Sequence, residues 1–207
     1  MREGTLVARL DGSSHDVFPV AVSAAEGEAL RDWITREQAS RTVEIGLGYG
    51  IAALFSCEGL RTNDDAGARH VTIDPHQEAR FANCGLQLLD EAGVTDLVEF
   101  YPQGSQIVLP CFLAKHRTFD VAFVDGNHRF DGVFLDLVYL GRLVRPGGIV
   151  FVDDFQLRSV ARAVSYCTSN LEWTIEAVSV AEDLHHWVVL RTPDIPPERP
   201  YDHYVDF

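Results

Sequence analysis

The sequence of 207 residues is 46% hydrophobic and 23% charged, a composition typical of one globular domain, with or without appendages. Its formal net charge of −14 argues against nucleic acid as a partner, because the phosphate backbone would be repelled over most of the surface. Neither a signal-peptide pattern nor a long apolar stretch is present, and the four cysteines are widely spaced. We therefore expect a cytoplasmic protein with free thiols and no membrane contact.

The first 40 residues are predicted to form an N-terminal helical cap segment. A short strand is possible at Thr5–Leu10. Ser23 and Glu26 then have the spacing of a capping box, in which each side chain satisfies an amide of the first helical turn. The helix that follows is predicted to turn its apolar residues to one face, namely Leu30, Trp33 and Ile34.

A glycine-rich turn follows the first clear strand. Thr42–Ile45 is β-branched and short, as in a buried strand, and Ile51 opens a helix. Between them lie three glycines at alternate positions, which let a ligand approach the backbone closely: Gly46, Gly48 and Gly50. A dinucleotide-binding turn requires glycine at position 51 instead. The spacing from Glu44 resembles motif I of class I S-adenosylmethionine (SAM)-dependent methyltransferases.

Strand and helix patterns continue to alternate as far as residue 192. After the glycine turn the pattern predicts a strand ending at Asp74, a helix from Pro75 to Gly93, and a strand at Leu97–Tyr101. A short segment from Gly104 should be interrupted by Pro110. The remaining predicted elements are a strand at Phe119–Asp125, a helix capped by Asp131, a turn at Pro146–Gly148, a strand at Ile149–Asp154, a helix around Val160–Cys167, and two antiparallel strands at Thr174–Val180 and Trp187–Arg191.

This alternation predicts an α/β fold: a doubly wound, mostly parallel, seven-stranded sheet with a C-terminal antiparallel strand pair. Residues 41–192 are expected to form the SAM-binding domain and residues 193–207 a proline-rich tail. The tail could dock on a second subunit or cover its own active site.

Three residues near the glycine turn are candidate cofactor contacts, each with a structural alternative. Asp74 ends a strand, where an acid can accept both hydroxyls of an adenosyl ribose, or it caps the next helix. Glu44 lies inside a strand, near the ammonium end of the methionine moiety or in a structural salt bridge. Ser105 stands where the adenine edge usually meets a loop, or it caps a helix.

A second group of polar residues follows two strands that should be neighbours. Asp125 ends one strand, and Asp153 and Asp154 end the next. Three crowded carboxylates repel one another unless a cation neutralises them, and all-oxygen ligation favours Mg²⁺. His128 could serve as a general base. The alternatives are a helix cap for Asp154 and a solvated loop histidine.

The stretches Phe119–Phe130 and Arg145–Asp154 resemble the bacterial small-molecule methyltransferase family called methyltransferase family 24. It is similar to the metal-dependent macrolide-sugar O-methyltransferases and the cephalosporin-hydroxylase-like proteins. The resemblance covers about residues 40–192. It implies that Asp125, Asp153 and Asp154 hold Mg²⁺, that His128 acts as base, and that SAM is the cofactor. Asp125 is also counted among the cofactor contacts.

The predicted function is therefore a SAM-dependent, divalent-metal-assisted O-methyltransferase of secondary metabolism, acting on a small hydroxylated metabolite such as a natural-product sugar. Two alternatives stay open. One is a non-catalytic SAM-binding accessory protein of a biosynthetic pathway, and the other is an N-methyltransferase that needs no metal. A homo-oligomer is compatible with the sequence.

Overall fold

The computed structural model describes residues 4–179 and 186–207. It divides into two compact units, Met1–Ser105 and Gln106–Phe207. The predicted division into residues 1–40, 41–192 and 193–207 has other boundaries and stays a prediction. Among the described residues, no helix combines the length and the apolar character needed to cross a membrane.

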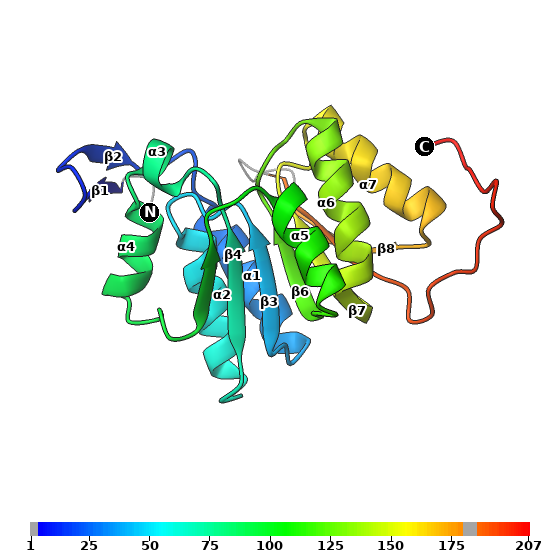
Figure 1. Cartoon of the computed structure of the whole chain (residues 1–207), viewed down its shortest axis with the longest axis horizontal. Helices are drawn as coiled ribbons and strands as arrows, with labels where there is room; N and C mark the ends of the chain where they lie inside the picture. Colours follow the sequence, from blue (N-terminus) through cyan, green and yellow to red (C-terminus); the bar gives the residue numbers. More distant parts are fainter. Residues whose placement is uncertain (1–3, 180–185) are drawn as a thin grey trace. The chain divides into compact units, whose positions relative to one another are not determined.

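The first unit contains three parallel strands. They are β3 (Arg41–Ile45), β4 (Arg69–Ile73) and β5 (Val98–Tyr101), and β4 pairs with both of the others. Helix α1 (Ala24–Arg36) packs against α2 (Ile51–Thr62), and the buried residues of α1 include the predicted Leu30, Trp33 and Ile34 (Figure 1). Ser23 caps α1 as predicted, since its Oγ accepts the N–H of Glu26 at 3.1 Å.

The N-terminal residues differ from the prediction, because they form a hairpin. Strand β1 (Thr5–Val7) is shorter than expected and pairs antiparallel with β2 (Ser14–Asp16). Residues from this region, Val17 and Ala21 among them, share an apolar cluster with Tyr49. The hairpin region thus supports the glycine-rich loop. The sequence did not indicate the hairpin, because strands of three residues are too short to show a clear pattern.

Two helix predictions were wrong in detail. The helix expected from Pro75 is broken into α3 (Gln77–Phe81) and α4 (Cys84–Glu91), because Ala82 and Asn83 adopt left-handed backbone with φ of 46° and 59°. Helix α5 (Ser105–Ala114) continues through Pro110, although proline removes a hydrogen-bond donor there. Burial of Val108, Leu109 and Phe112 on both sides of the proline stabilises this helix.

Among the described strands of the second unit there are one parallel and two antiparallel pairings. Strand β6 (Phe119–Val124) pairs parallel with β7 (Val144–Val152), which starts earlier than predicted and runs through the expected Pro146–Gly148 turn. Strand β9 (Val188–Arg191) pairs antiparallel with β7 and with β8 (Thr174–Val178). Residue 180 of the predicted strand lies outside the described residues. Helix α6 (Phe130–Leu143) packs against α7 (Arg158–Asn170) (Figure 1).

The predicted fold class is confirmed: an α/β fold with seven mostly parallel strands, flanking helices and a C-terminal antiparallel pair. The predicted inward face of α7 is confirmed as well, since Val160 and Cys167 are buried. The cap predicted for α6 is wrong, because Arg129 occupies the N-cap position and Asp131 lies in the first turn.

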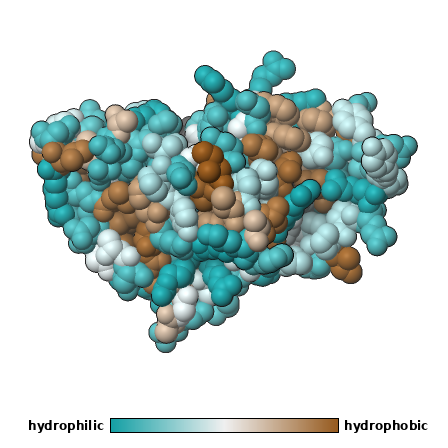
Figure 2. Space-filling view, viewed as in Figure 1, coloured by the Kyte–Doolittle hydropathy of each residue, from teal (hydrophilic) through white to brown (hydrophobic). Residues whose placement is uncertain are grey.

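The C-terminal segment contacts α7 and the start of α6. The side-chain amide of Asn170 exchanges two hydrogen bonds of 2.8 Å with the backbone of Val205. The ring of Phe207 lies 5.1 Å from that of Tyr166 and 6.5 Å from that of Phe130. Figure 2 shows separate apolar areas among hydrophilic side chains over α5 and α6. The homo-oligomer stays a prediction.

Candidate functional site

The glycine-rich loop between β3 and α2 has a backbone that only glycine adopts readily. Its three glycines have φ of 95°, 52° and 82° at Gly46, Gly48 and Gly50. A β-carbon built on Gly50 would lie 3.0 Å from the carbonyl oxygen of Gly85, so this side of the loop is packed. Among the described residues, one built on Gly48 would meet only an atom of Val20, 3.9 Å away. The backbone at Gly48 therefore leaves room for a ligand.

Asp74 follows β4 and is tied to this loop. It is 4% exposed. One carboxylate oxygen accepts the N–H of Gly48 at 3.1 Å and the side-chain amide of Gln77 at 2.8 Å, and the other accepts the N–H of His76 at 2.7 Å. A carboxylate has about four acceptor sites, so one is left for a ligand hydroxyl. The ribose contact stays a prediction, and Asp74 also holds the chain ahead of α3.

Glu44 is completely buried in β3 and pairs with a residue of β4. The Nε2 atom of His70 lies 3.2 Å from a carboxylate oxygen of Glu44, and its Nδ1 atom lies 2.8 Å from the hydroxyl of Thr42. Burial raises the pKa of Glu44, and the hydrogen bond with His70 opposes that rise. The structural salt bridge considered for Glu44 thus has His70 as its partner. A contact with the methionine moiety stays a prediction.

Ser105 is the first residue of α5 and is partly exposed. The helix cap considered for Ser105 is not found, because Ser105 already lies within the helix and the flanking N-cap position is Gly104. The contact with the adenine edge is not tested by the structure. That contact stays a prediction.

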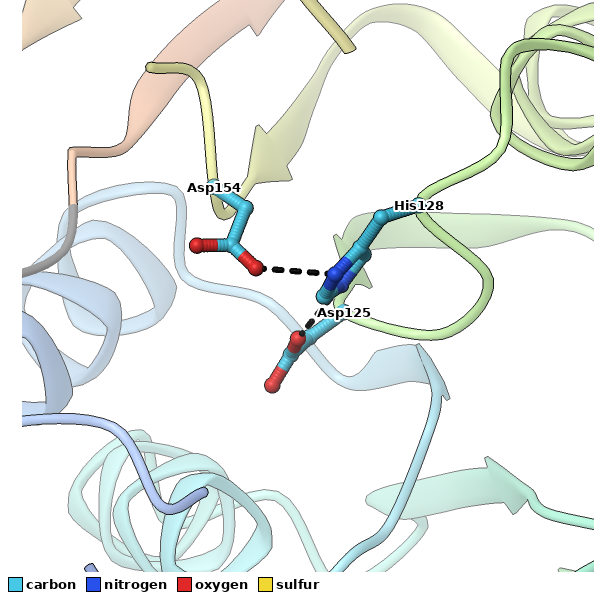
Figure 3. Close-up of side chains that lie close together, drawn as sticks. All are labelled: Asp125, His128 and Asp154. Atoms are coloured by element: carbon cyan, nitrogen blue, oxygen red, sulfur yellow. Dashed lines mark hydrogen bonds and ion pairs between the residues drawn. The ribbon is translucent and has the colours of Figure 1, made fainter. Parts of the chain in front are cut away.

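Two acids and a histidine converge beyond the ends of β6 and β7 (Figure 3). Asp125 directly follows β6, His128 lies on the loop before α6, and Asp154 follows β7. The Nδ1 atom of His128 lies 2.9 Å from Asp154 Oδ2, and Nε2 lies 3.3 Å from Asp125 Oδ1. One ligand atom from each residue lies within 4.8 Å of the others. The predicted pairing of the two strands, which brings these residues together, is confirmed.

Asp153 is not one of the converging ligands in the described part of the chain. It is 4% exposed, and its Oδ1 accepts the N–H of Asp154 at 2.6 Å. The predicted set of three carboxylates is therefore found as two carboxylates and His128. A direct metal contact by Asp153 stays a prediction, and its charge acts on Asp125 in any case.

The charges of this cluster are strongly coupled. Burial raises the pKa of Asp125 to about 7; the hydrogen bond with His128 opposes the rise, and the charges of Asp153 and Asp154 add to it. Hydrogen bonds with Asp125 and then with Asp154 raise the pKa of His128 to about 10. At neutral pH His128 is therefore an imidazolium held between two acids. It neutralises charge at the position where a cation would do the same.

Two supporting residues were not identified from the sequence. Gln156 donates from Nε2 to the second oxygen of Asp154 at 2.6 Å, and Ser159 donates to the carbonyl oxygen of His128 at 2.6 Å. Asp154 itself has left-handed backbone, with φ of 54°. Gln156 stands two positions after Asp154, but no spacing rule indicates that its side chain turns back. Only the fold shows these contacts.

Residues 43–155 match a known protein family. Over this range, more than half of the chain, the sequence matches the family model Methyltransf_24, described as a methyltransferase domain. The chain belongs to this methyltransferase family. The resemblance predicted from the residues is thereby confirmed.

Several proteins are similar to this member of the methyltransferase family. Caffeoyl-CoA O-methyltransferase of Stellaria longipes is 28% identical over 144 residues, which is 68% of this chain and 56% of that protein. Catechol O-methyltransferase of Mycobacterium tuberculosis is 27% identical over 150 residues, or 72% of this chain and 64% of that one. The matched part thus spans between about half and two thirds of the length of these relatives.

Two solved structures are similar to this chain over most of its length. The O-methyltransferase TomG from Streptomyces achromogenes, in complex with SAM, is 26% identical with a TM-score of 0.71, over 84% of this chain and 82% of TomG. The O-methyltransferase from Bacillus cereus, in complex with S-adenosylhomocysteine (SAH), has a TM-score of 0.71 at 18% identity, over 85% of this chain and 84% of that one. At that identity the second likeness shows the fold alone.

Proposed function

We propose that the protein is a SAM-dependent O-methyltransferase that acts on a small hydroxylated metabolite with the help of a divalent cation. The observation that carries the proposal is the convergence of Asp125, His128 and Asp154 beyond two parallel strands of a methyltransferase-family fold. The names of the relatives support transfer to oxygen, since caffeoyl-CoA and catechol O-methyltransferases are among them. A sugar is one acceptor class to test beside aromatic diols.

The cofactor contacts are proposed on the glycine-rich loop and Asp74. Backbone at Gly46 and Gly48 is partly exposed, and the space beside Gly48 fits a ligand that approaches the main chain. Asp74 keeps one acceptor site for a ribose hydroxyl. SAM bound there would supply a methyl group on a sulfonium, and the sulfur would leave as the neutral thioether of SAH, which is a good leaving group. TomG, described with SAM bound, supports the choice of cofactor.

Asp125, His128 and Asp154, here called the acid–histidine cluster, offer ligand atoms that fit a hard divalent cation. Two carboxylates offer oxygen ligands, and the ligand atoms are close enough to share one ion. A divalent cation held by Asp125 and Asp154 would lower the pKa of an acceptor hydroxyl and orient it. Burial raises the pKa of Asp125, and hydrogen bonds with Asp125 and Asp154 raise the pKa of His128. A cation bound by these acids would favour the ionised form of Asp125 and would take the place of the imidazolium charge.

His128 is proposed as the group that takes up the hydroxyl proton. While its ring nitrogens face Asp125 and Asp154, it holds its own proton and cannot act as a base. If the oxygens of these acids bound a cation, the imidazole would lose the two acceptors that raise its pKa and would release its proton to solvent. It can then receive a proton at Nδ1 or Nε2. The rest of the rate comes from aligning the acceptor oxygen with the methyl group.

Calorimetric titration of chelator-stripped protein tests the proposal. SAM and SAH should both bind, and Mg²⁺ should give a separate isotherm that disappears in Asp125→Ala. A panel of sugars and aromatic diols then tests turnover. Absence of binding by SAM and SAH would overturn the proposal. Turnover of a sugar or diol that survives chelation would overturn the role of the cation, and metal-independent methylation of an amine acceptor instead would point to an N-methyltransferase. Binding without turnover on any acceptor would point to an accessory protein.

A further inference from the structure

Gln77 joins the two parts of the proposed cofactor site. It is the first residue of α3 and is 2% exposed. Its Nε2 atom donates to the carbonyl oxygen of Gly48 at 2.7 Å and to Asp74 Oδ2 at 2.8 Å. The same oxygen of Asp74 accepts the N–H of Gly48 at 3.1 Å. The three residues therefore form a closed ring of hydrogen bonds around the tip of the loop.

We infer that Gln77 is a positioning residue, which fixes the glycine-rich loop to Asp74 and so preorganises the site for SAM. The inference rests on the proposed function and adds a residue to it. Gln77 is not assigned a contact with the cofactor. It acts through Gly48 and Asp74, whose positions it sets before any ligand arrives.

The chemistry of the ring requires an amide at position 77. Both neighbours, the Gly48 carbonyl and the Asp74 carboxylate, are acceptors, so the side chain must present two donors from one atom. Only an amide nitrogen does this without adding a charge. A glutamate of the same shape would present oxygens to two acceptors, and a methionine would present neither donor nor charge.

Gly85 packs closely against the ring of hydrogen bonds. A β-carbon built on Gly85 would lie 2.6 Å from the Gly48 carbonyl oxygen and 2.9 Å from Gln77 Oε1. That Oε1 atom is buried, with no hydrogen-bond partner among the described residues. Leaving a buried acceptor unpaired lowers the stability of the fold. The Gln77 side chain thus donates hydrogen bonds to Gly48 and Asp74 while its own oxygen is left without a hydrogen-bond partner among the described residues.

The consequence is a loop that need not be ordered by the cofactor. A loop with three glycines at alternate positions has many conformations when it is unrestrained. A ligand that must order such a loop binds more weakly, because the lost conformational entropy reduces the binding free energy. A site held by surrounding hydrogen bonds avoids this loss. Replacing Gln77 should therefore weaken the binding of SAM and SAH, while the cluster of Asp125, His128 and Asp154 in the second unit stays unchanged.

The test is calorimetric titration of the full chain with SAH, comparing wild type with Gln77→Met and Gln77→Glu. Gln38→Met is the matched control, since Gln38 Nε2 also donates to a backbone carbonyl, that of Thr35 at 2.8 Å, but on the exposed surface after α1. We expect Gln77→Met to weaken SAH binding about tenfold, as for the loss of one or two hydrogen bonds. The control should bind like wild type, and Mn²⁺ affinity should be equal in all four proteins.

Gln77→Glu adds a pH signature that general loss of structure does not produce. At about pH 8 the ionised side chain faces two acceptors, and SAH binding should be weaker than in Gln77→Met. Burial and the adjacent carboxylate of Asp74 raise the pKa of a glutamate at this position, so at about pH 5.5 a larger share of it is protonated and can donate one hydrogen bond. The ratio of its dissociation constant to that of wild type should therefore fall. This measurement also keeps the inference testable if the methionine variant does not fold.

The outcomes separate the two claims. Wild-type affinity in Gln77→Met, or a pH-independent ratio for Gln77→Glu, overturns the positioning role and leaves the proposed function standing. Failure of the wild-type protein itself to bind SAH overturns the proposed function, and the inference with it.

Discussion

His128 lies with its Nδ1 atom 2.9 Å from a carboxylate oxygen of Asp154, and this pairing joins the proposed base to a proposed metal ligand. While these two side chains are paired, His128 cannot act as a base and the paired oxygen of Asp154 cannot bind a cation. Hydrogen bonds with Asp125 and then with Asp154 raise the pKa of His128 to about 10, so the imidazole is protonated while both acids face it. Binding of a cation and release of His128 are therefore linked, and substitutions at Asp154 should affect both.

Asp154→Asn should abolish the divalent-ion isotherm and most of the turnover while SAH affinity changes little. Removal of an outer partner of a metal ligand costs about 10–100-fold in affinity, and loss of a ligand should cost more. Calorimetry with Mn²⁺ and with SAH measures both effects. Asp131→Asn is the control, because Asp131 is exposed in the first turn of α6. Wild-type turnover of Asp154→Asn in the presence of a chelator would remove Asp154 from the mechanism.

Divalent-ion affinity should increase with pH. Because burial raises the pKa of Asp125 to about 7, a proton competes with the cation for this carboxylate near neutrality, and His128 competes for both acids while it is protonated. Each proton released on binding strengthens the apparent affinity by up to about tenfold per pH unit below the relevant pKa. Mn²⁺ titrations at about pH 6 and pH 8, in buffers of different ionisation enthalpy, count these protons. A dissociation constant independent of pH would contradict the proposed ligands.

The sequence was sufficient for the fold class because each strand and helix of a parallel sheet has a strong local pattern. It also placed Asp125, His128 and Asp154 at one edge, since strand ends can be counted along the chain. The sequence was not sufficient where the backbone conformation of one or two residues determines whether a helix continues. The break between α3 and α4 depends on the left-handed Ala82 and Asn83, and neither residue is a strong helix breaker.

Side-chain direction was the other limit. Asp153 and Asp154 are adjacent, yet Oδ1 of the first accepts the backbone N–H of the second, while the second faces His128. The bridging amide of Gln77 and the pairing of Glu44 with His70 depend on contacts between separate strands or turns. A single sequence contains the residues of such contacts but not their geometry.

Asp74→Asn should weaken SAH binding about tenfold or more and also lower stability. The substitution places an amide where Asp74 now accepts three hydrogen bonds, so at least one buried donor loses its acceptor, at a cost of about 1–3 kcal/mol. Calorimetry and thermal unfolding measure the two effects. Asp64→Asn is a matched control, because Asp64 is exposed in the same unit and asparagine tolerates its φ of 54°. An unchanged SAH dissociation constant would exclude Asp74 from the cofactor site.

Gly59→Ala should destabilise the fold by about 1–3 kcal/mol, because the contact between α1 and α2 has no space for a methyl group. A β-carbon at Gly59 would lie 2.8 Å from a side-chain atom of Ile34 and 3.1 Å from the carbonyl oxygen of Arg31. Urea unfolding with a constant slope measures the change. Glu58→Ala, at the neighbouring exposed position, should stay within about 0.5 kcal/mol of wild type. Equal stability of the two variants would contradict the close helix packing.

One thiol should react rapidly with a soluble reagent, and three should be protected. Cys111 is exposed on α5, whereas Cys57, Cys84 and Cys167 are buried and all four are free. Burial also raises the pKa of Cys57 and of Cys167 to about 12, so almost no reactive thiolate forms there at about pH 8. Labelling with a chromogenic disulfide should show a single fast equivalent that Cys111→Ser removes, and the other three only after unfolding. A second fast equivalent in the native protein would mean that one of the buried helix faces opens to solvent.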